Sequence, residues 1–282
     1  MTTDSLAAQT GAHPFDDADI RLIVSDMDGT LLDEHGAVPE RLWQQLEGLR
    51  ERGIVFAPAS GRQYAALREL FERAIDGMVV IAENGSIVMQ DGVELSSVTI
   101  EREGAAAIVR TLRQLAADGA DLGIVLCGKR GAVVERGDAG FLEATRQYFA
   151  AFEVVDDVLE HDDEILKLAV IDFHDPAAVA AALSAFSATH QIVVSSDRWV
   201  DIMSRSVDKG VAVRALQERL GVTPAQTAVF GDYLNDLQML DAAEHSFAMA
   251  NAHPTVRERA RHTAGSNAEH GVVDAIERLL AR

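Results

Sequence analysis

Short apolar runs alternate with amphipathic stretches along this chain, and this alternation limits the fold more than any other feature of the sequence. Four such runs are Ile20–Val24, Ile54–Phe56, Met78–Ala82 and Ala228–Phe230. Strands of a parallel sheet are covered by helices on both faces, so they appear as nearly continuous apolar segments. We therefore predict an α/β fold with βαβ units and a doubly wound, mostly parallel sheet.

Two stretches between these runs have the pattern of helices. Residues 39–52 carry Leu42, Leu46 and Leu49 at helical spacing, and Pro39 suits a first helical turn. Residues 211–220 are predicted to form a further helix, which begins just after a lysine and a glycine.

The middle of the chain has a different pattern, with a hairpin and further strands and helices, and is predicted to form a second, smaller α/β domain over residues 85–199. Residues 86–95 suggest a hairpin around Gln90-Asp91-Gly92. Helices are predicted at 101–117 and 176–190, and strands at 122–127, 165–173 and 192–194. Residues 20–84 and 200–282 then form the core domain, and residues 1–19 a mobile extension before the first strand.

The composition narrows the class of protein. Hydrophobic residues make up 48% of the chain, and no stretch approaches the roughly 20 consecutive apolar residues of a membrane span. The first 19 residues contain four Asp and no Lys or Arg, so the basic start of a secretory signal is missing. Cys127 is the only cysteine, which rules out an internal disulfide. We expect it to be buried in a strand, and we expect a cytoplasmic location.

The formal net charge of −20 argues against binding to nucleic acid or to an anionic membrane. The same charge would repel an anionic substrate. A site for a phosphorylated molecule therefore needs its own positive charge, from a metal ion and a few well-placed Lys or Arg side chains.

Asp26-Met27-Asp28-Gly29-Thr30 follows the first apolar run directly. Positions i and i+2 of an extended chain point the same way, so the two carboxylates are predicted to be crowded at the end of a strand. A divalent cation or a shared proton relieves such repulsion. Taken alone, the segment also fits a solvated Asp-Gly turn. With the hydroxyl of Thr30, it also has the groups needed for phosphoryl transfer through an aspartate.

Polar clusters follow two of the other apolar runs, and a lysine opens a predicted helix. These segments are Ser60-Gly61-Arg62, Asp208-Lys209-Gly210 and Gly231-Asp232 with Asn235-Asp236. In open α/β sheets, ligands bind beyond the carboxyl ends of the strands. If the strands are neighbours, Asp26, Asp28, Ser60 and Asp232 converge on one pocket.

This ordered set of segments resembles the haloacid dehalogenase superfamily of phosphatases, most closely its Cof-type branch. Residues 29–59 are too few to hold a folded domain, whereas residues 63–208 hold an α/β cap easily. Glu83-Asn84-Gly85, Met249-Ala250-Asn251-Ala252 and Glu269-His270-Gly271-Val272 also match that branch. Ser60 stands where relatives often have Thr, and it keeps the hydroxyl. The resemblance covers nearly all of the chain after residue 19.

The resemblance implies a role for each residue. Asp26 is the nucleophile that forms an aspartyl-phosphate, and Asp28 is the general acid and base. Asp26, the backbone carbonyl of Asp28 and Asp232 hold Mg²⁺. The remaining implied roles are phosphate binding by Ser60, Gly61, Lys209 and Asn235, with support from Thr30, Arg62 and Asp236. Arg62 is expected either to reach the substrate or to brace the cap, and Asp236 to orient Lys209.

The resemblance implies a Mg²⁺-dependent phosphatase acting on a small phosphorylated metabolite, either a sugar phosphate or a phosphorylated cofactor. Two alternatives remain open: a phosphomutase of the same superfamily, and a receiver-like switch that forms a phospho-aspartate without turnover. Free phosphate, isomerised product or a stable phospho-aspartate distinguishes the three. The sequence leaves the oligomeric state and the substrate-contacting residues of the cap open.

Overall fold

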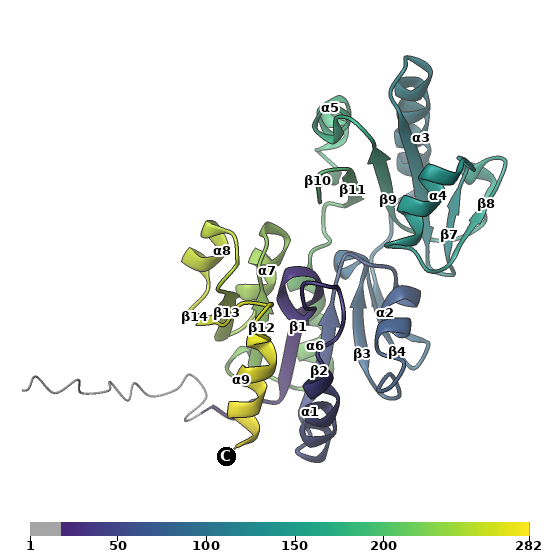
Figure 1. Cartoon of the computed structure of the whole chain (residues 1–282). Coiled ribbons are helices and arrows are strands. Elements are labelled where there is room, and N and C mark those ends of the chain that lie inside the picture. The colour runs from purple at the N-terminus through teal and green to yellow at the C-terminus, as the bar shows by residue number, and fades with distance from the viewer. Residues whose placement is uncertain (1–17, 282) are drawn as a thin grey trace, which may run out of the picture.

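The computed structural model describes residues 18–281 and contains two β-sheets, each with its own hydrophobic core (Figure 1). The chain passes from the first sheet into the second after residue 97 and returns before residue 209. Within the described residues, no helix combines the length and the apolar character needed to cross a lipid bilayer.

The first sheet has eight strands in the order β14-β13-β12-β1-β2-β3-β4-β5. Strands β14 to β3 in this order run parallel, and β4 and β5 are antiparallel. Their bounds are β1 Leu22–Asp26, β2 Val55–Ala59, β3 Val79–Ala82, β4 Ile87–Gln90, β5 Val93–Ser97, β12 Thr227–Gly231, β13 His245–Met249 and β14 His262–Ala264. Strand β1 lies between β12 and β2, so the carboxyl ends of these three strands meet at one edge.

Helices cover this sheet, with α1 packed on α9 and α6 packed on α7. They are α1 Glu40–Glu51, α2 Tyr64–Leu70, α6 Lys209–Leu220, α7 Leu237–Leu240, α8 Pro254–Arg259 and α9 Gly271–Leu280. Helix α1 buries Leu42, Leu46 and Leu49, the apolar positions from which it was predicted. Helix α6 begins two residues earlier than predicted, because the Asp208 carboxylate accepts a hydrogen bond from the Val211 N–H and caps the helix.

The second sheet has six strands in the order β10-β11-β9-β6-β7-β8, all antiparallel except the β7–β8 pair. Its elements are α3 Arg102–Ala117, β6 Leu122–Gly128, β7 Ala132–Val134, α4 Ala139–Arg146, β8 Phe152–Val154, β9 Ile165–Asp172, α5 Pro176–Ala182, β10 His190–Val194 and β11 Trp199–Ser204. Helices α3 and α5 contribute to the core on one face, and α4 contributes to the core on the other. Cys127 is fully buried in β6, as predicted.

The structure differs from the sequence prediction in two places. The hairpin predicted at 86–95 forms β4 and β5 of the first sheet, because Ile87 and Val88 pack into the first core and β4 pairs with β3. The helix predicted at 176–190 ends at Ala182, and His190 pairs with Ser204 at the start of β10. We propose that the second domain spans about residues 98–206 rather than 85–199. Most of the extension predicted at 1–19 lies outside the described residues.

Candidate functional site

Asp26 is the last residue of β1, at the centre of the edge where the parallel strands end. Its side chain is buried, and the next residues leave the strand in a tight turn, Met27–Leu31. Gly29 adopts φ 81° in this turn, and a Cβ there would lie 2.4 Å from Asp232 Oδ2. Only glycine therefore lets the turn approach the loop that follows β12.

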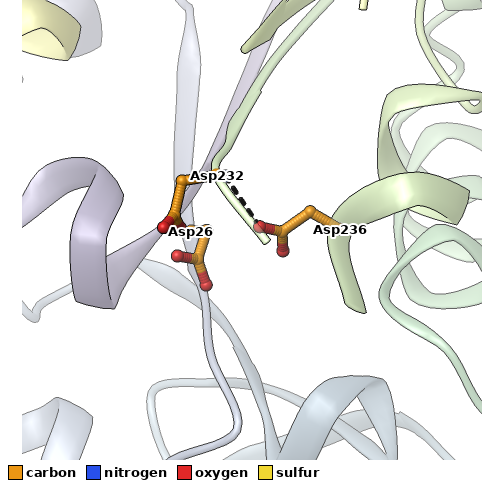
Figure 2. A group of neighbouring side chains, drawn as sticks. All are labelled: Asp26, Asp232 and Asp236. Atoms are coloured by element: carbon orange, nitrogen blue, oxygen red, sulfur yellow. Dashed lines mark hydrogen bonds between the residues drawn. The ribbon is translucent and has the colours of Figure 1, made fainter. Parts of the chain in front are cut away.

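Three carboxylates gather at this edge (Figure 2). Asp26, Asp232 and Asp236 each offer an oxygen, and these oxygens lie within 4.8 Å of one another. Thr30 Oγ1 donates a 2.9 Å hydrogen bond to Asp232 Oδ1, which orients that carboxylate. A cluster of carboxylate oxygens is the ligand set that Mg²⁺ prefers in proteins, so the chemistry of these residues fits the ion.

Asp236 is already fully engaged with the protein. Its Oδ1 accepts a 2.7 Å hydrogen bond from Lys209 Nζ, and its Oδ2 accepts from the backbone N–H groups of Asp232 and Tyr233 at 3.0 and 3.2 Å. Figure 2 shows the Asp236 carboxylate turned toward the backbone of Asp232. We infer that Asp236 orients Lys209 and the Asp232 loop, which leaves Asp26 and Asp232 to face a cation.

The three acids at this edge carry more negative charge, when ionised, than the single ammonium of Lys209 offsets. Burial and the nearby Asp236 raise the pKa of Asp26 well above its usual value, although Lys209 opposes them. Burial and Asp236 also raise the pKa of Asp232 to about 6. Burial disfavours the charge on Lys209, but attraction to Asp236 and Asp26 outweighs it and raises the pKa of the ammonium. Three acids facing one buried lysine leave an excess of negative charge that a divalent cation would neutralise.

The turn Ser60–Arg62 follows β2 and reaches the same edge. Ser60 is buried, and its backbone N–H donates to the carbonyl of Ile81 in β3. A Cβ on Gly61 would lie 3.1 Å from the side-chain amide of Asn84, so the turn packs closely on the loop after β3.

Arg62 forms an ion pair with Asp28, a contact that neither sequence expectation for this residue included. Its guanidinium binds both carboxylate oxygens of Asp28, at 2.8 and 2.5 Å. The same group lies 5.9 Å from the centre of the Tyr148 ring, which comes from the second domain. Arg62 therefore holds Asp28 in place and touches the second domain at the same time.

One cavity of about 430 Å³ lies at this edge, between the two domains. Most of the predicted site residues line it: Asp26, Asp28, Ser60, Gly61, Arg62, Asp232 and Asn235. Lys209 lies behind Asp26 and forms a hydrogen bond to it, while Thr30 and Asp236 contact the residues that line the cavity. Asn235 was predicted to bind phosphate, and here its amide donates a 3.3 Å hydrogen bond to Asn84.

The sequence did not identify the lining residues from the second domain. They are Tyr148, Phe149, Lys167, Ser195, Ser196, Asp197, Trp199 and Asp201. Lys167 and Asp201 could have been identified from the sequence, because each is a charged residue inside a mostly apolar strand. The serines sit in a loop, and nothing in their spacing pointed to this cavity.

Comparison with known proteins shows which family the chain matches. The model of the haloacid dehalogenase-like hydrolase family matches residues 23–276. The chain is 31% identical over 266 residues to the 5-amino-6-(5-phospho-D-ribitylamino)uracil phosphatase of Escherichia coli K12, an alignment that covers 93% of this chain and 96% of that protein. A phosphatase of the same name from Bacillus subtilis 168 is 26% identical over 263 residues, covering 93% and 96%.

Solved structures share the fold. A protein from Streptococcus mutans UA159 superposes with a TM-score of 0.83 at 29% identity, covering 93% of this chain and all 100% of that one. A protein from Thermotoga maritima superposes with a TM-score of 0.80 at 25% identity, covering 92% and 97%. Both alignments extend over the two sheets, so the arrangement of core and second domain is shared.

Proposed function

Because the chain belongs to the haloacid dehalogenase-like hydrolase family, we propose that it is a Mg²⁺-dependent phosphatase that hydrolyses small phosphomonoesters through an aspartyl-phosphate on Asp26. The family and the curated relatives make it a phosphoric monoester hydrolase of the Cof type. The position of Asp26 supports the route through this residue. Asp26 is the last residue of the central strand β1, and its carboxylate accepts a hydrogen bond from Lys209 and lines the cavity.

We assign the metal site to the carboxylates of Asp26 and Asp232 and the backbone carbonyl of Asp28. Their oxygens suit Mg²⁺, and the uncompensated acids described above give the ion a reason to bind. When bound, Mg²⁺ would supply positive charge that lets the phosphate group approach the Asp26 carboxylate.

The protein groups divide the chemistry between them. An Asp26 oxygen attacks phosphorus, the bond from phosphorus to the ester oxygen breaks, and Asp28 donates a proton to that oxygen. Asp28 then takes a proton from the water that attacks the phospho-aspartate, which releases phosphate and restores Asp26. Both carboxylate oxygens of Asp28 accept hydrogen bonds from Arg62, so the guanidinium must release one of them before that oxygen can pass a proton to the ester oxygen.

Three donors are available for the phosphate oxygens in this proposal. We propose that the Ser60 hydroxyl, the Gly61 N–H and the Lys209 ammonium donate hydrogen bonds to them, more strongly as charge builds up during transfer. Asn235 is bonded to Asn84, so in this proposal it supports the cavity wall rather than contacting phosphate directly.

The second domain is proposed to select the substrate. To the cavity it contributes three aromatic rings, Tyr148, Phe149 and Trp199, and the hydroxyls of Ser195 and Ser196. Aromatic faces with hydroxyl groups suit a molecule that combines a flat ring with a polyol chain. We therefore propose a phosphorylated cofactor precursor as the substrate class, with 5-amino-6-(5-phospho-D-ribitylamino)uracil as its first candidate because two curated relatives are named for it.

A panel of phosphomonoesters tests the proposal. The purified protein is incubated with Mg²⁺ and with the phosphoribityl pyrimidine, flavin mononucleotide, pyridoxal phosphate, hexose phosphates or p-nitrophenyl phosphate, and released phosphate is measured. We expect turnover of several of these compounds and the highest kcat/KM for a ring-bearing one. A hexose phosphate that is isomerised without release of phosphate would contradict hydrolysis.

Removal of the metal is expected to abolish this turnover. Treatment with excess EDTA should reduce the rate to background, and added Mg²⁺ should restore it, because Asp26 and the phosphate otherwise repel each other. An enzyme that keeps its full rate after exhaustive chelation would exclude the ion from the mechanism.

The affinity for Mg²⁺ is expected to fall as the pH falls. The raised pKa values of Asp26 and of Asp232, the latter about 6, mean that a proton occupies these carboxylates in mildly acidic solution. Each such proton must leave before the metal binds, so the Mg²⁺ concentration for half-maximal activity should rise up to about tenfold per pH unit below about pH 6 for each proton released. Mg²⁺ titrations between about pH 5 and about pH 8 measure it; a constant half-saturation concentration across that range would contradict the assignment.

A further inference from the structure

Lys167 is a buried cation that the mechanism above does not use. It belongs to β9 of the second sheet, and its ammonium lies 2.8 Å from Glu83 of the first domain and 3.3 Å from Asp201 of β11. It also donates a 2.7 Å hydrogen bond to the backbone carbonyl of Gly61. Both acids are buried, so the ammonium stays charged where it is. Lys167 therefore links the second domain to the turn Ser60–Arg62, which we call the phosphate-binding turn after its proposed role.

Three consecutive backbone carbonyls of that turn each accept a hydrogen bond. The carbonyl of Ser60 accepts from the backbone N–H of Asn84 at 2.9 Å, and the carbonyl of Arg62 accepts from the backbone N–H of Glu83 at 3.1 Å. The carbonyl between them, on Gly61, accepts from Lys167. The two outer donors belong to the first domain, so only the middle carbonyl depends on the second domain.

The orientation of the Gly61 carbonyl determines what the next N–H group can reach. The C=O of Gly61 and the N–H of Arg62 belong to one planar peptide group and point in opposite directions. That N–H donates a 3.1 Å hydrogen bond to Ser60 Oγ. A hydroxyl oxygen that accepts this bond keeps its own proton free to donate. Anchoring the Gly61 carbonyl therefore leaves the Ser60 hydroxyl ready to donate to a phosphate oxygen.

The loop that carries Glu83 is held in an uncommon conformation at the same place. Glu83 and Asn84 have φ values of 51° and 57°, in the left-handed region that few side chains adopt. The Asn84 amide in turn donates to Asp201 at 3.3 Å, beside Lys167. The loop after β3, the turn after β2 and the second domain thus meet at one ammonium.

We propose that Lys167 is a positioning residue that makes the phosphate-binding turn competent only when the second domain is seated on the first. Its ammonium orients the Gly61–Arg62 peptide, and through that peptide it prepares the Ser60 hydroxyl. This inference rests on the phosphatase function proposed above, in which Ser60 donates to the phosphate. The Ser60 hydroxyl is then oriented for phosphate only while the second domain, which selects the substrate, contacts the turn.

Two variants and one control test the role of the ammonium. Lys167→Met removes it, and Lys167→Met with Glu83→Gln also removes one of the buried charges left behind, so that the domain interface keeps its fold. The control is Lys129→Met, because Lys129 also joins the two domains, through Glu94 at 3.0 Å and Glu164 at 3.1 Å, without touching the turn. With p-nitrophenyl phosphate, we expect both Lys167 variants to lose about 10- to 100-fold in kcat and the control to keep the parent kcat. A double variant with parent kcat, or a control with the same loss, would overturn the proposal.

A double-mutant cycle with Ser60→Ala identifies the path of the effect. If Lys167 acts through the Ser60 hydroxyl, adding Lys167→Met and Glu83→Gln to Ser60→Ala should lower kcat by less than about threefold. A merely structural role would give the same loss in both backgrounds, and such additivity would overturn the proposal. Thermal melting of each variant confirms that the compared proteins are folded. If the parent protein releases no phosphate from any ester, the proposed function fails; if the parent is active and only the cycle is additive, this inference alone fails.

Discussion

The Asp26→Asn variant is expected to lose about 10⁴-fold or more in kcat and to remain folded. An amide cannot attack phosphorus as a carboxylate does, and it is a weak ligand for Mg²⁺. Asp26 stands at the centre of the proposed chemistry, because it would bond to phosphorus and bind the metal in the same step. Phosphate release at saturating substrate and Mg²⁺ measures the loss.

The stability of this variant separates lost chemistry from lost structure. Burial already raises the pKa of Asp26, so replacing the carboxylate by a neutral amide removes a charge that the fold tolerates poorly. Lys209 keeps its hydrogen bond to Asp236. In EDTA we expect a Tm equal to or above that of the parent. Asp241→Asn, the same change at an exposed acid paired with Arg259, is the matched control and should leave kcat unchanged. A rate for Asp26→Asn within tenfold of the parent would refute the nucleophile assignment.

Lys209→Met is expected to affect both activity and stability. The ammonium is buried between Asp26 and Asp236, so its removal leaves two carboxylates without a counter-charge. Breaking a buried ion pair in this way costs about 3–5 kcal/mol, which corresponds to a decrease of roughly 6–20 °C in Tm for a chain of this size. We expect kcat to fall by about 10²–10³-fold as well, because in the proposed mechanism the ammonium donates to the transferring phosphate.

A second substitution tests whether the two effects have separate causes. Adding Asp26→Asn to Lys209→Met removes one of the uncompensated charges and should recover part of the Tm, while turnover stays absent. Lys129→Met, at a lysine whose partners lie near the surface, should lower Tm by no more than about 4 °C. A Lys209→Met protein with the parent Tm and the parent kcat would show that the buried ammonium has neither role.

The sequence predicted four strands of the core sheet, but it did not show which sheet the hairpin at 86–95 joins. The apolar runs around Ile23, Phe56, Val80 and Val229 were enough to place β1, β2, β3 and β12, because few other elements are apolar at every position, whereas the parallel strands β13 and β14 were not predicted. The hairpin β4–β5 belongs to the first sheet, whereas the sequence had suggested the second domain. The hairpin lies at one end of that sheet, and which sheet a hairpin joins depends on tertiary contacts that its own sequence does not encode.

The site likewise has a part that the sequence predicted and a part that it did not. Asp26, Asp28, Ser60 and Asp232 follow strands that lie side by side, so strand order alone brings them together. The contact between Arg62 and Asp28 and the bond from Lys167 to Gly61 join residues 34 and 106 positions apart. Strand order does not specify which partner a long side chain takes after folding, so neither contact was predicted.

The sequence by itself determined the chemistry available to this protein: which strands are buried, which polar residues end them, and therefore which acids, hydroxyl and lysine stand at the edge of the sheet. Asp236 lies against Lys209, as expected from the resemblance, whereas only the tertiary structure decided that Arg62 binds Asp28 and that Lys167 binds the carbonyl of Gly61. The physical reason is that strand burial follows from local hydrophobic pattern, whereas a buried charge takes the partner that folding places beside it.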